Sequence, residues 1–132
     1  MKKLITTLIL LLMFSSPSYA KWEKWDKDKD GNTLYVDFDT MRQHDGSVYF
    51  WWLADLLKPN SDGNFSGKSY IQGDCKLSRY KFLTVSAYTQ PMGEGEPSVS
   101  TKVPTDWRYP IPNVPITTFL NAICKRMGIP SS

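Results

Sequence analysis

Alternating apolar and polar side chains predict several short β-strands in this chain. In residues 33–38 every second side chain is apolar, which is the period of a half-buried strand. Asp30-Gly31 precedes this segment and supplies the positive φ that a hairpin turn needs. Residues 40–47 are expected to form a connection closed by a second Asp-Gly turn. Residues 21–25 and 98–102 are short and mixed, so we expect edge strands there.

Residues 47–57 form the most apolar predicted strand, and both of its faces are hydrophobic. One face carries Val48, Phe50, Trp52, Ala54 and Leu56, and the other carries Tyr49, Trp51, Leu53 and Leu57. A strand that is apolar on both sides is expected in the middle of a sheet with a cover on each face. We expect a helix on one face and a loop or a partner subunit on the other.

Two further strands are predicted on either side of Cys75. Residues 68–72 begin the first, Gly73-Asp74 is expected to turn or bulge it, and residues 76–88 form a long inner strand. Strict alternation in that second strand predicts two faces: one with Arg79, Lys81, Leu83, Val85 and Ala87, the other with Tyr80, Phe82 and Tyr88.

A C-terminal helix is predicted by apolar residues that recur at steps of three and four. These residues are Ile116, Phe119, Leu120, Ile123 and Met127. Pro115 fits the first turn, Asn113 is the expected N-cap, and Gly128 ends the helix. Residues 103–115 contain four prolines and are expected to run extended over the surface.

The first twenty residues have the pattern of a cleaved secretory signal peptide. Lys2 and Lys3 precede an apolar run, and Ser18 and Ala20 place small side chains at the two positions that a signal peptidase reads, so cleavage is expected before Lys21. The run is shorter than the roughly 20 residues of a membrane-spanning helix, so we expect no stable membrane insertion after cleavage. An uncleaved anchor is the alternative. No cysteine occupies the cleavage site, so no lipid anchor is expected.

The remaining residues, 21–132, have the length of one domain and almost no net charge. Loss of Lys2 and Lys3 reduces the formal net charge from +3 to +1. This balance does not have the basic excess of a nucleic-acid-binding protein, so no nucleic-acid partner is expected.

The two cysteines, Cys75 and Cys124, are predicted to form one disulfide in an oxidising compartment. Cys124 lies beside the apolar stripe of the helix, and Cys75 lies between two strands. The bond would then hold the helix on the sheet. A redox pair of free thiols and an intermolecular bond are the alternatives.

The acidic segment with Asp26, Asp28 and Asp30 resembles the first half of a calcium-binding loop. Position twelve of such a loop is Asp37 instead of a glutamate, and Lys27 and Lys29 stand between the carboxylates. No helical pattern flanks the segment. We therefore interpret it as a solvated hairpin tip and expect no metal or cofactor, with calcium binding as the alternative.

The sequence contains no grouping of residues that predicts an enzyme. His44 is the only histidine and lies beside a turn, and both cysteines are used by the predicted disulfide. A pair of carboxylates acting on a glycosidic bond is the alternative that sequence leaves open.

The aromatic residues are the best candidates for binding a partner. Trp22, Trp25, Tyr49 and Trp51 are predicted anchors, because aromatic side chains contribute strongly at interfaces. Packing in the core is the alternative for each of them.

The chain resembles the protein E-like family of bacterial surface adhesins. The resemblance rests on a series of short matches: Trp25, Leu34-Tyr35-Val36-Asp37, residues 48–56, Ser69-Tyr70, Asp74-Cys75, Arg79, Tyr88 to Gly95, Trp107 and Cys124. It implies an α+β fold, with an antiparallel meander sheet of about five to six strands. One C-terminal helix packs on this sheet and is tethered by the disulfide.

The resemblance also implies an exported, non-enzymatic binding protein with a host-matrix type of protein ligand, and it allows a homodimer. Without a lipid anchor, we expect a periplasmic, secreted or cell-surface protein. The alternative function is a periplasmic structural, inhibitory or calcium-binding protein with another partner.

Overall fold

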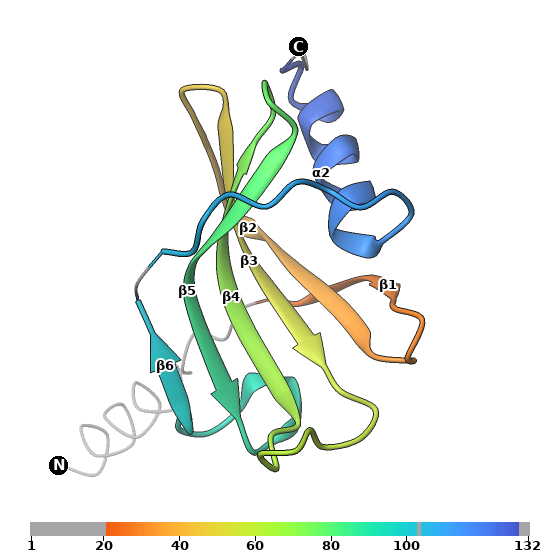
Figure 1. Ribbon diagram of the computed structural model, residues 1–132, viewed down its shortest axis with the longest axis vertical. Coiled ribbons are helices and arrows are strands. Elements are labelled where there is room, and N and C mark those ends of the chain that lie inside the picture. Colours follow the sequence, from red (N-terminus) through yellow and green to blue (C-terminus); the bar gives the residue numbers. More distant parts are fainter. Residues whose placement is uncertain (1–20, 103, 130–132) are drawn as a thin grey trace, which may run out of the picture.

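One antiparallel sheet of six strands dominates the described part of the chain, and its strand order follows the sequence (Figure 1). The computed structural model describes residues 21–102 and 104–129, so the predicted signal peptide lies outside the described residues. The strands are β1 (Glu23–Lys27), β2 (Thr33–His44), β3 (Ser47–Asp55), β4 (Ser66–Asp74), β5 (Arg79–Tyr88) and β6 (Val99–Thr101). The predicted α+β meander with one C-terminal helix is confirmed.

Strand β2 is longer than the sequence pattern predicted. It continues to His44, and a register irregularity lies between Asp37 and Arg42. The predicted connection over residues 40–47 is therefore wrong for residues 40–44. Only Asp45 and Gly46 form the turn, with φ of 49° and 79°. Glycine adopts this left-handed backbone without steric cost, which explains the tight reversal.

Helix α2 (Pro115–Arg126) begins at the proline that the sequence placed in its first turn. Proline tolerates this position because the first N–H groups of a helix have no partner within the helix. The N-cap residue is Val114, so the prediction of Asn113 was wrong. Asn113 instead adopts a left-handed φ of 67° in the turn that leads into the helix.

Helix α2 packs on one face of the sheet, which we call the helix face, and Phe119 lies at the centre of the contact. Its ring is surrounded by four aromatic rings, with centroid distances of 5.1 Å to Trp25, 6.0 Å to Phe38, 4.9 Å to Phe50 and 5.6 Å to Trp52. The buried core on this face also includes Leu34, Val36, Val48, Ile71, Leu120 and Ile123.

The predicted disulfide between Cys75 and Cys124 is present, and it joins the turn after β4 to the last turn of α2. Both cysteines are buried, with 2% and 7% of their surfaces exposed. Gly73 lies close to this bond and allows Leu120 and Val48 to pack against its backbone. The helix is therefore held to the sheet by a covalent bond and by close packing at the same place.

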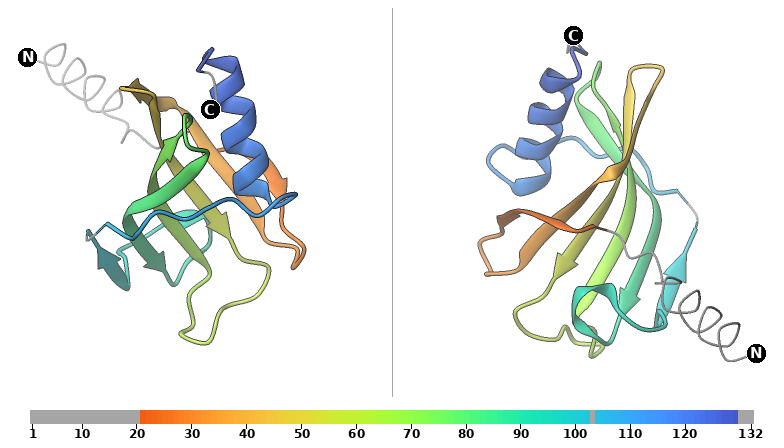
Figure 2. Two further views of the ribbon diagram at one scale, coloured as in Figure 1. Left: turned by 45° about the horizontal axis from the view of Figure 1, so that its top comes forward. Right: turned by 180° about the vertical axis from the view of Figure 1, so that it is seen from behind.

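The short 3-10 helix η1 (Pro91–Gly93) lies at one end of the opposite face of the sheet (Figure 2). Two hydrogen bonds attach it: Met92 N donates to Asp55 Oδ1 at 2.8 Å, and Gly93 N donates to Ser66 Oγ at 2.7 Å. Leu53, which points to this face, is fully buried. The second cover expected for β3 is thus a loop of the same chain, and it covers one end of the strand.

A bulge in β5 changes which of its residues face the helix. The register with β4 shifts, so that Tyr70 pairs with Thr84 but Ile71 pairs with Phe82. Because Leu83 is the additional residue, Phe82 lies on the helix face and Thr84 on the other. The strict alternation predicted for residues 76–88 is therefore wrong across Leu83.

The two edges of the sheet differ in how they are protected. Strand β6 pairs with one half of β5, and residues 105–108 bond to the other half. Thr105 N donates to Phe82 O at 2.9 Å, and Arg108 N donates to Tyr80 O at 2.7 Å. At the other edge, β1 has five residues, of which four are charged and exposed. Short, charged or covered edges oppose pairing with another strand.

Replacing both Cys75 and Cys124 with alanine should lower the free energy of unfolding. The bond closes a loop with a sequence separation of 49 residues. Chain entropy then gives a loss of about 4 kcal/mol. Urea denaturation of the double variant and of the oxidised parent measures this loss. An unchanged midpoint would show that the helix does not depend on the bond.

Replacing Gly73 with alanine should destabilise the helix–sheet contact. The new Cβ would overlap with Leu120 Cδ1 and would lie 3.1 Å from Val48 Cγ2. Overpacking of this kind typically costs about 1–3 kcal/mol. Gly67→Ala on the same strand is the control, because the nearest atom to its Cβ is Ser86 O at 3.4 Å. Equal melting temperatures of the two variants would contradict the prediction.

Candidate functional site

Three partly exposed aromatic side chains form a continuous strip on the sheet face that lies opposite the helix. We call Tyr49, Trp51 and Tyr70 the aromatic strip. The rings of Tyr49 and Tyr70 are stacked with centroids 6.3 Å apart, and those of Trp51 and Tyr70 are 4.9 Å apart and tilted by 39°. Each of the three side chains is partly buried by its neighbours and partly open to solvent.

The register of the central strands places these rings together. Trp51 on β3 pairs directly with Tyr70 on β4, and Tyr49 pairs with Gln72. Directly paired residues share a face, and residues two apart on one strand also share it. The strip therefore lies opposite Phe50 and Trp52, which pack on the helix side of the same strand.

Basic residues surround the strip at the β5 side. The Arg79 guanidinium lies 4.1 Å and the Lys81 ammonium 4.5 Å from the centre of the Trp107 ring. Arg79 also donates from Nε to Asp74 Oδ2 at 3.0 Å. Cation–π contacts hold charged groups in place without neutralising them, so Lys81 stays a defined positive charge beside the strip.

Two polar groups border the strip on neighbouring strands. Asp37 pairs with Trp51 and is only 2% exposed, and its Oδ1 accepts a hydrogen bond from Asp39 N at 3.1 Å. Thr84 pairs with Tyr70, and its Oγ1 is buried without a protein hydrogen-bond partner. Neither group offers an accessible negative charge to a molecule on the strip.

The structure places the four predicted anchors in three different surroundings. Tyr49 and Trp51 belong to the aromatic strip. Trp25 lies on the helix face, where it packs edge-on against Phe119 and donates from Nε1 to Pro115 O at 3.2 Å. Trp22 lines a hollow of about 630 Å³ beside η1. The partner-binding role of each of the four stays a prediction.

Sequence reasoning did not select Tyr70 as a candidate. Tyr70 stands in a mixed segment without an obvious apolar run, and only its pairing with Trp51 places it in the strip. A sequence-based signal would have required the register of β3 and β4. That register pairs residues 47–55 with residues 66–74, across a loop of ten residues.

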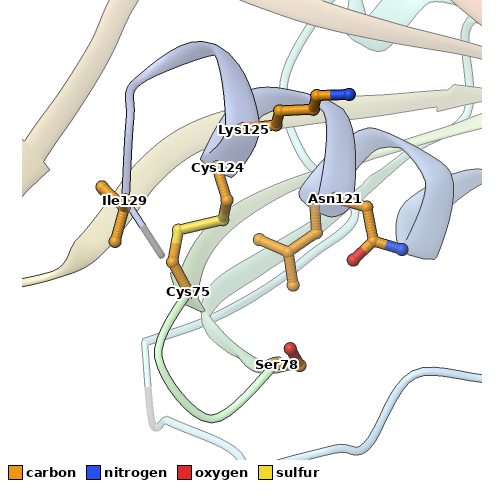
Figure 3. A pocket seen from close by; sticks show the side chains of 7 residues that line it. Cys75, Ser78, Asn121, Cys124, Lys125 and Ile129 are labelled. Carbon is orange, nitrogen blue, oxygen red and sulfur yellow. A yellow bond between two sulfur atoms is a disulfide. The ribbon is translucent and has the colours of Figure 1, made fainter. Parts of the chain in front are cut away.

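A second hollow, of about 480 Å³, lies beside the disulfide. Figure 3 shows that Asn121 and Lys125 reach it from α2 and that Ser78 reaches it from the turn before β5. Among the described residues that line it, there is no histidine or carboxylate, and the two sulfur atoms are bonded to each other. The hollow follows from the packing of helix and turn around the bond.

The acidic hairpin uses the Asp28 carboxylate to hold its own backbone. Asp28 Oδ1 accepts hydrogen bonds from Asp30 N at 2.9 Å and Asn32 N at 3.0 Å, and Oδ2 accepts one from Asn32 Nδ2 at 3.0 Å. Partial burial acts to raise the pKa of Asp28, but these hydrogen bonds outweigh it and lower the pKa below 3.8. The carboxylate is thus a structural acceptor in the turn.

The structure also shows the surroundings of the single histidine, and it bears on the metal site and the membrane-spanning helix that the sequence analysis considered. His44 lies at the end of β2, highly exposed, with Nε2 3.1 Å from Asp45 Oδ2. Within residues 21–102 and 104–129, no three His, Cys, Asp or Glu side chains gather in a way that could hold a metal ion. In the same residues, no helix has the length and hydrophobicity needed to span a membrane.

The fold and the site define a small α+β domain with a disulfide-tethered helix on one face of its sheet and an exposed aromatic strip on the other. The family model for surface-adhesin protein E matches residues 22–125, so the chain belongs to the surface-adhesin protein E family. The resemblance read from the sequence is thereby confirmed.

Solved structures of Haemophilus influenzae protein E have the same fold. Crystal form II of that protein is 16% identical, with a TM-score of 0.64 over 87% of this chain and 97% of that chain. Protein E from non-typeable Haemophilus influenzae is 15% identical, with a TM-score of 0.62 over 90% of this chain and 88% of that chain. At such identities the likeness concerns the fold. No curated protein matches the chain.

Replacing Asp28 with alanine should destabilise the protein at neutral pH and matter less in acid. Loss of a carboxylate that caps backbone N–H groups costs about 1 kcal/mol. Because the folded pKa is lowered, the stabilisation is fully present above pH 3.8 and is lost as the pH falls through the folded pKa. Denaturation at pH 7 and at a series of decreasing acidic pH values measures the difference, with Asp30→Ala as the exposed control.

The same melting measurement, repeated with millimolar calcium and with a chelator, tests the calcium alternative. We expect equal melting temperatures in the parent, because Asp28 already serves the turn. A higher melting temperature in calcium that Asp28→Ala abolishes would instead establish a cation site.

Proposed function

We propose that this chain is an exported, non-enzymatic binding protein of the adhesin type, which holds a protein ligand of the host-matrix class against the aromatic strip. Membership of the surface-adhesin protein E family supports binding as the general function. The aromatic strip supports the choice of surface. The proposal includes Tyr49 and Trp51 from the predicted anchors and adds Tyr70.

The observation that carries the proposal is the unequal cover of the face opposite the helix. At one end, η1 is bonded to Asp55 and Ser66, and Leu53 on the same face is completely buried. At the other end, three large aromatic rings remain partly exposed. Exposed aromatic clusters with fixed geometry are typical of interaction surfaces, because they bury a large area while losing little side-chain entropy.

Export is supported by two features of the chain. Residues 1–20 have the pattern of a signal peptide, and the buried Cys75–Cys124 bond suits an oxidising compartment. Membership of a surface-adhesin family also implies a protein outside the cytoplasm. We therefore place the protein in the periplasm, at the cell surface or in the medium.

A non-enzymatic role is supported by the chemistry of the described residues. His44 is exposed beside Asp45, and the carboxylates of Asp28, Asp55 and Asp74 accept structural hydrogen bonds. General acid–base chemistry needs such groups free, close together and facing a substrate. The aromatic strip instead offers flat rings, which bind without reacting.

Replacing Trp51 or Tyr70 with alanine should weaken binding to a matrix protein by about tenfold or more, because each substitution removes a ring at the centre of the strip. Purified protein is tested by surface plasmon resonance against fibronectin, laminin, type IV collagen and plasma proteins. Tyr109→Ala is the matched control, because this tyrosine is 69% exposed and lies outside the strip.

Circular dichroism and melting curves confirm that each variant is folded before binding is compared. Absence of binding to every member of the panel would contradict the adhesin role. Binding that is unaffected by both strip variants, or reduced equally by Tyr109→Ala, would contradict the assignment of the surface.

A further inference from the structure

Two cations stand at the ends of a row of side chains that crosses the aromatic strip. Arg42 on β2 pairs with Tyr49, Tyr49 pairs with Gln72, and Gln72 pairs with Lys81 on β5. All four side chains share the face opposite the helix. Neighbouring strands are about 4.8 Å apart, so the backbone positions of Arg42 and Lys81 are separated by roughly 14 Å along the row.

Both cations are available to a ligand. Among the described residues, neither Arg42 nor Lys81 forms an ion pair, whereas Arg79 is paired with Asp74. Arg42 is exposed, and the Lys81 ammonium is positioned over the Trp107 ring. A guanidinium offers paired N–H donors that match the oxygens of an anionic group, and an ammonium offers a compact charge.

The carboxylates of the same face do not cancel this charge at the surface. Asp37, beside Trp51, is buried, and Asp74 is bonded to Arg79. Asp55 accepts the Met92 N–H under η1. Asp39 on β2 is exposed, and its Oδ2 lies 4.0 Å from Lys21 Nζ. Arg42 and Lys81 are therefore the cations of the row that form no ion pair among the described residues, although residues 21–132 carry a formal net charge of only +1.

We propose that the aromatic strip and its two cations bind a sulfated glycosaminoglycan chain. The C–H faces of sugar rings pack on aromatic rings, and Arg42 and Lys81 bind sulfates on either side. The Gln72 amide donates one N–H to Ser47 Oγ at 3.2 Å and offers its second N–H and its oxygen to hydroxyl groups. The inference rests on the proposed function, because it assigns a ligand class to the same surface.

The shape of the site favours a linear glycan over other anionic polymers. The two cations stand at the ends of a row over four strands, and the rings of Trp51 and Tyr70 lie beside Tyr49 and Gln72 in the next row along β3 and β4. This arrangement matches a chain that alternates flat sugar rings and projecting charges. Nucleic acids require more positive charge than two unpaired cations supply. An acidic peptide that adds a strand would need a free sheet edge, but β6 and residues 105–108 cover the β5 edge.

The experiment measures binding of a size-defined heparin oligosaccharide by isothermal titration calorimetry at low and at physiological salt. We expect measurable binding that weakens as salt increases, because exposed charges are screened. Arg42→Gln and Lys81→Gln should each reduce affinity about threefold to tenfold, and Tyr70→Ala should reduce it about tenfold. A desulfated oligosaccharide of the same length should bind much more weakly.

Lys58→Gln and Lys125→Gln are the matched controls, because both lysines are exposed outside this face and should not change affinity. The glycan proposal would be overturned by absence of heparin binding, by equal losses in the control variants, or by single-stranded DNA or a poly-glutamate peptide binding as tightly as heparin.

A parallel assay with matrix proteins separates this result from the proposed function. Matrix proteins that bind the strip while heparin does not would overturn the glycan proposal alone. Heparin that binds while glycan-free and glycan-bearing matrix proteins both fail would contradict the protein-ligand role and support the glycan site. Loss of matrix binding after heparinase treatment would support both.

Discussion

The packing of Phe119 into the sheet is the contact on which the rest of the structure depends. Its ring reaches from α2 into a cage of aromatic rings supplied by β1, β2 and β3, with centroids 4.9–6.0 Å away. A single helix of 12 residues can cover only part of a six-stranded sheet. The aromatic cage concentrates the contact over the first strands, and the Cys75–Cys124 bond fixes the helix at its other end, beside β4.

Because α2 packs on only one face of the sheet, the opposite face keeps partly exposed aromatic side chains. The strand at the centre, β3, is apolar on both sides, so its second side also needs partial shelter from water. Helix η1 gives that shelter to Leu53, and the rings of the aromatic strip shelter one another through stacking. The resulting surface is rigid because it belongs to paired strands, and it stays partly open because no second helix of residues 21–102 and 104–129 covers it. A fixed, half-open aromatic surface is suited to binding.

The fold could be predicted from the sequence wherever a local pattern decided it. The alternation in residues 33–38, the helical stripe from Ile116 to Met127 and the two cysteines each pointed to the element that the structure contains. Apart from the N-cap of α2, which is Val114 and not Asn113, the errors fall where long-range contacts decide. The continuation of β2 beyond Asp39 depends on pairing with β3, and the change of face at Leu83 depends on a bulge against β4.

The candidate site was less predictable for the same reason. Tyr49 and Trp51 could be selected because one strand holds both, but Tyr70 joins them only through the register of a second strand. Trp25 belongs to a residue type that often anchors a partner at an interface, but here it packs under α2. Its Nε1 donates to Pro115 O, which is 90 residues away in sequence. Sequence patterns define elements, whereas a site on a sheet is defined by how several elements are aligned.

The protected edges of the sheet have a consequence for how binding can change in evolution. When a peptide adds a strand to a sheet edge, it binds mainly through main-chain hydrogen bonds, which most sequences can form. In this sheet, β6 and residues 105–108 bond along β5, and the other edge strand, β1, is short and charged, so few main-chain groups are accessible for such pairing. In the proposed function, a ligand is instead recognised through side chains on a face that bears little of the core. Such positions can be substituted singly without loss of the fold, so related chains can keep one scaffold while exchanging their ligands.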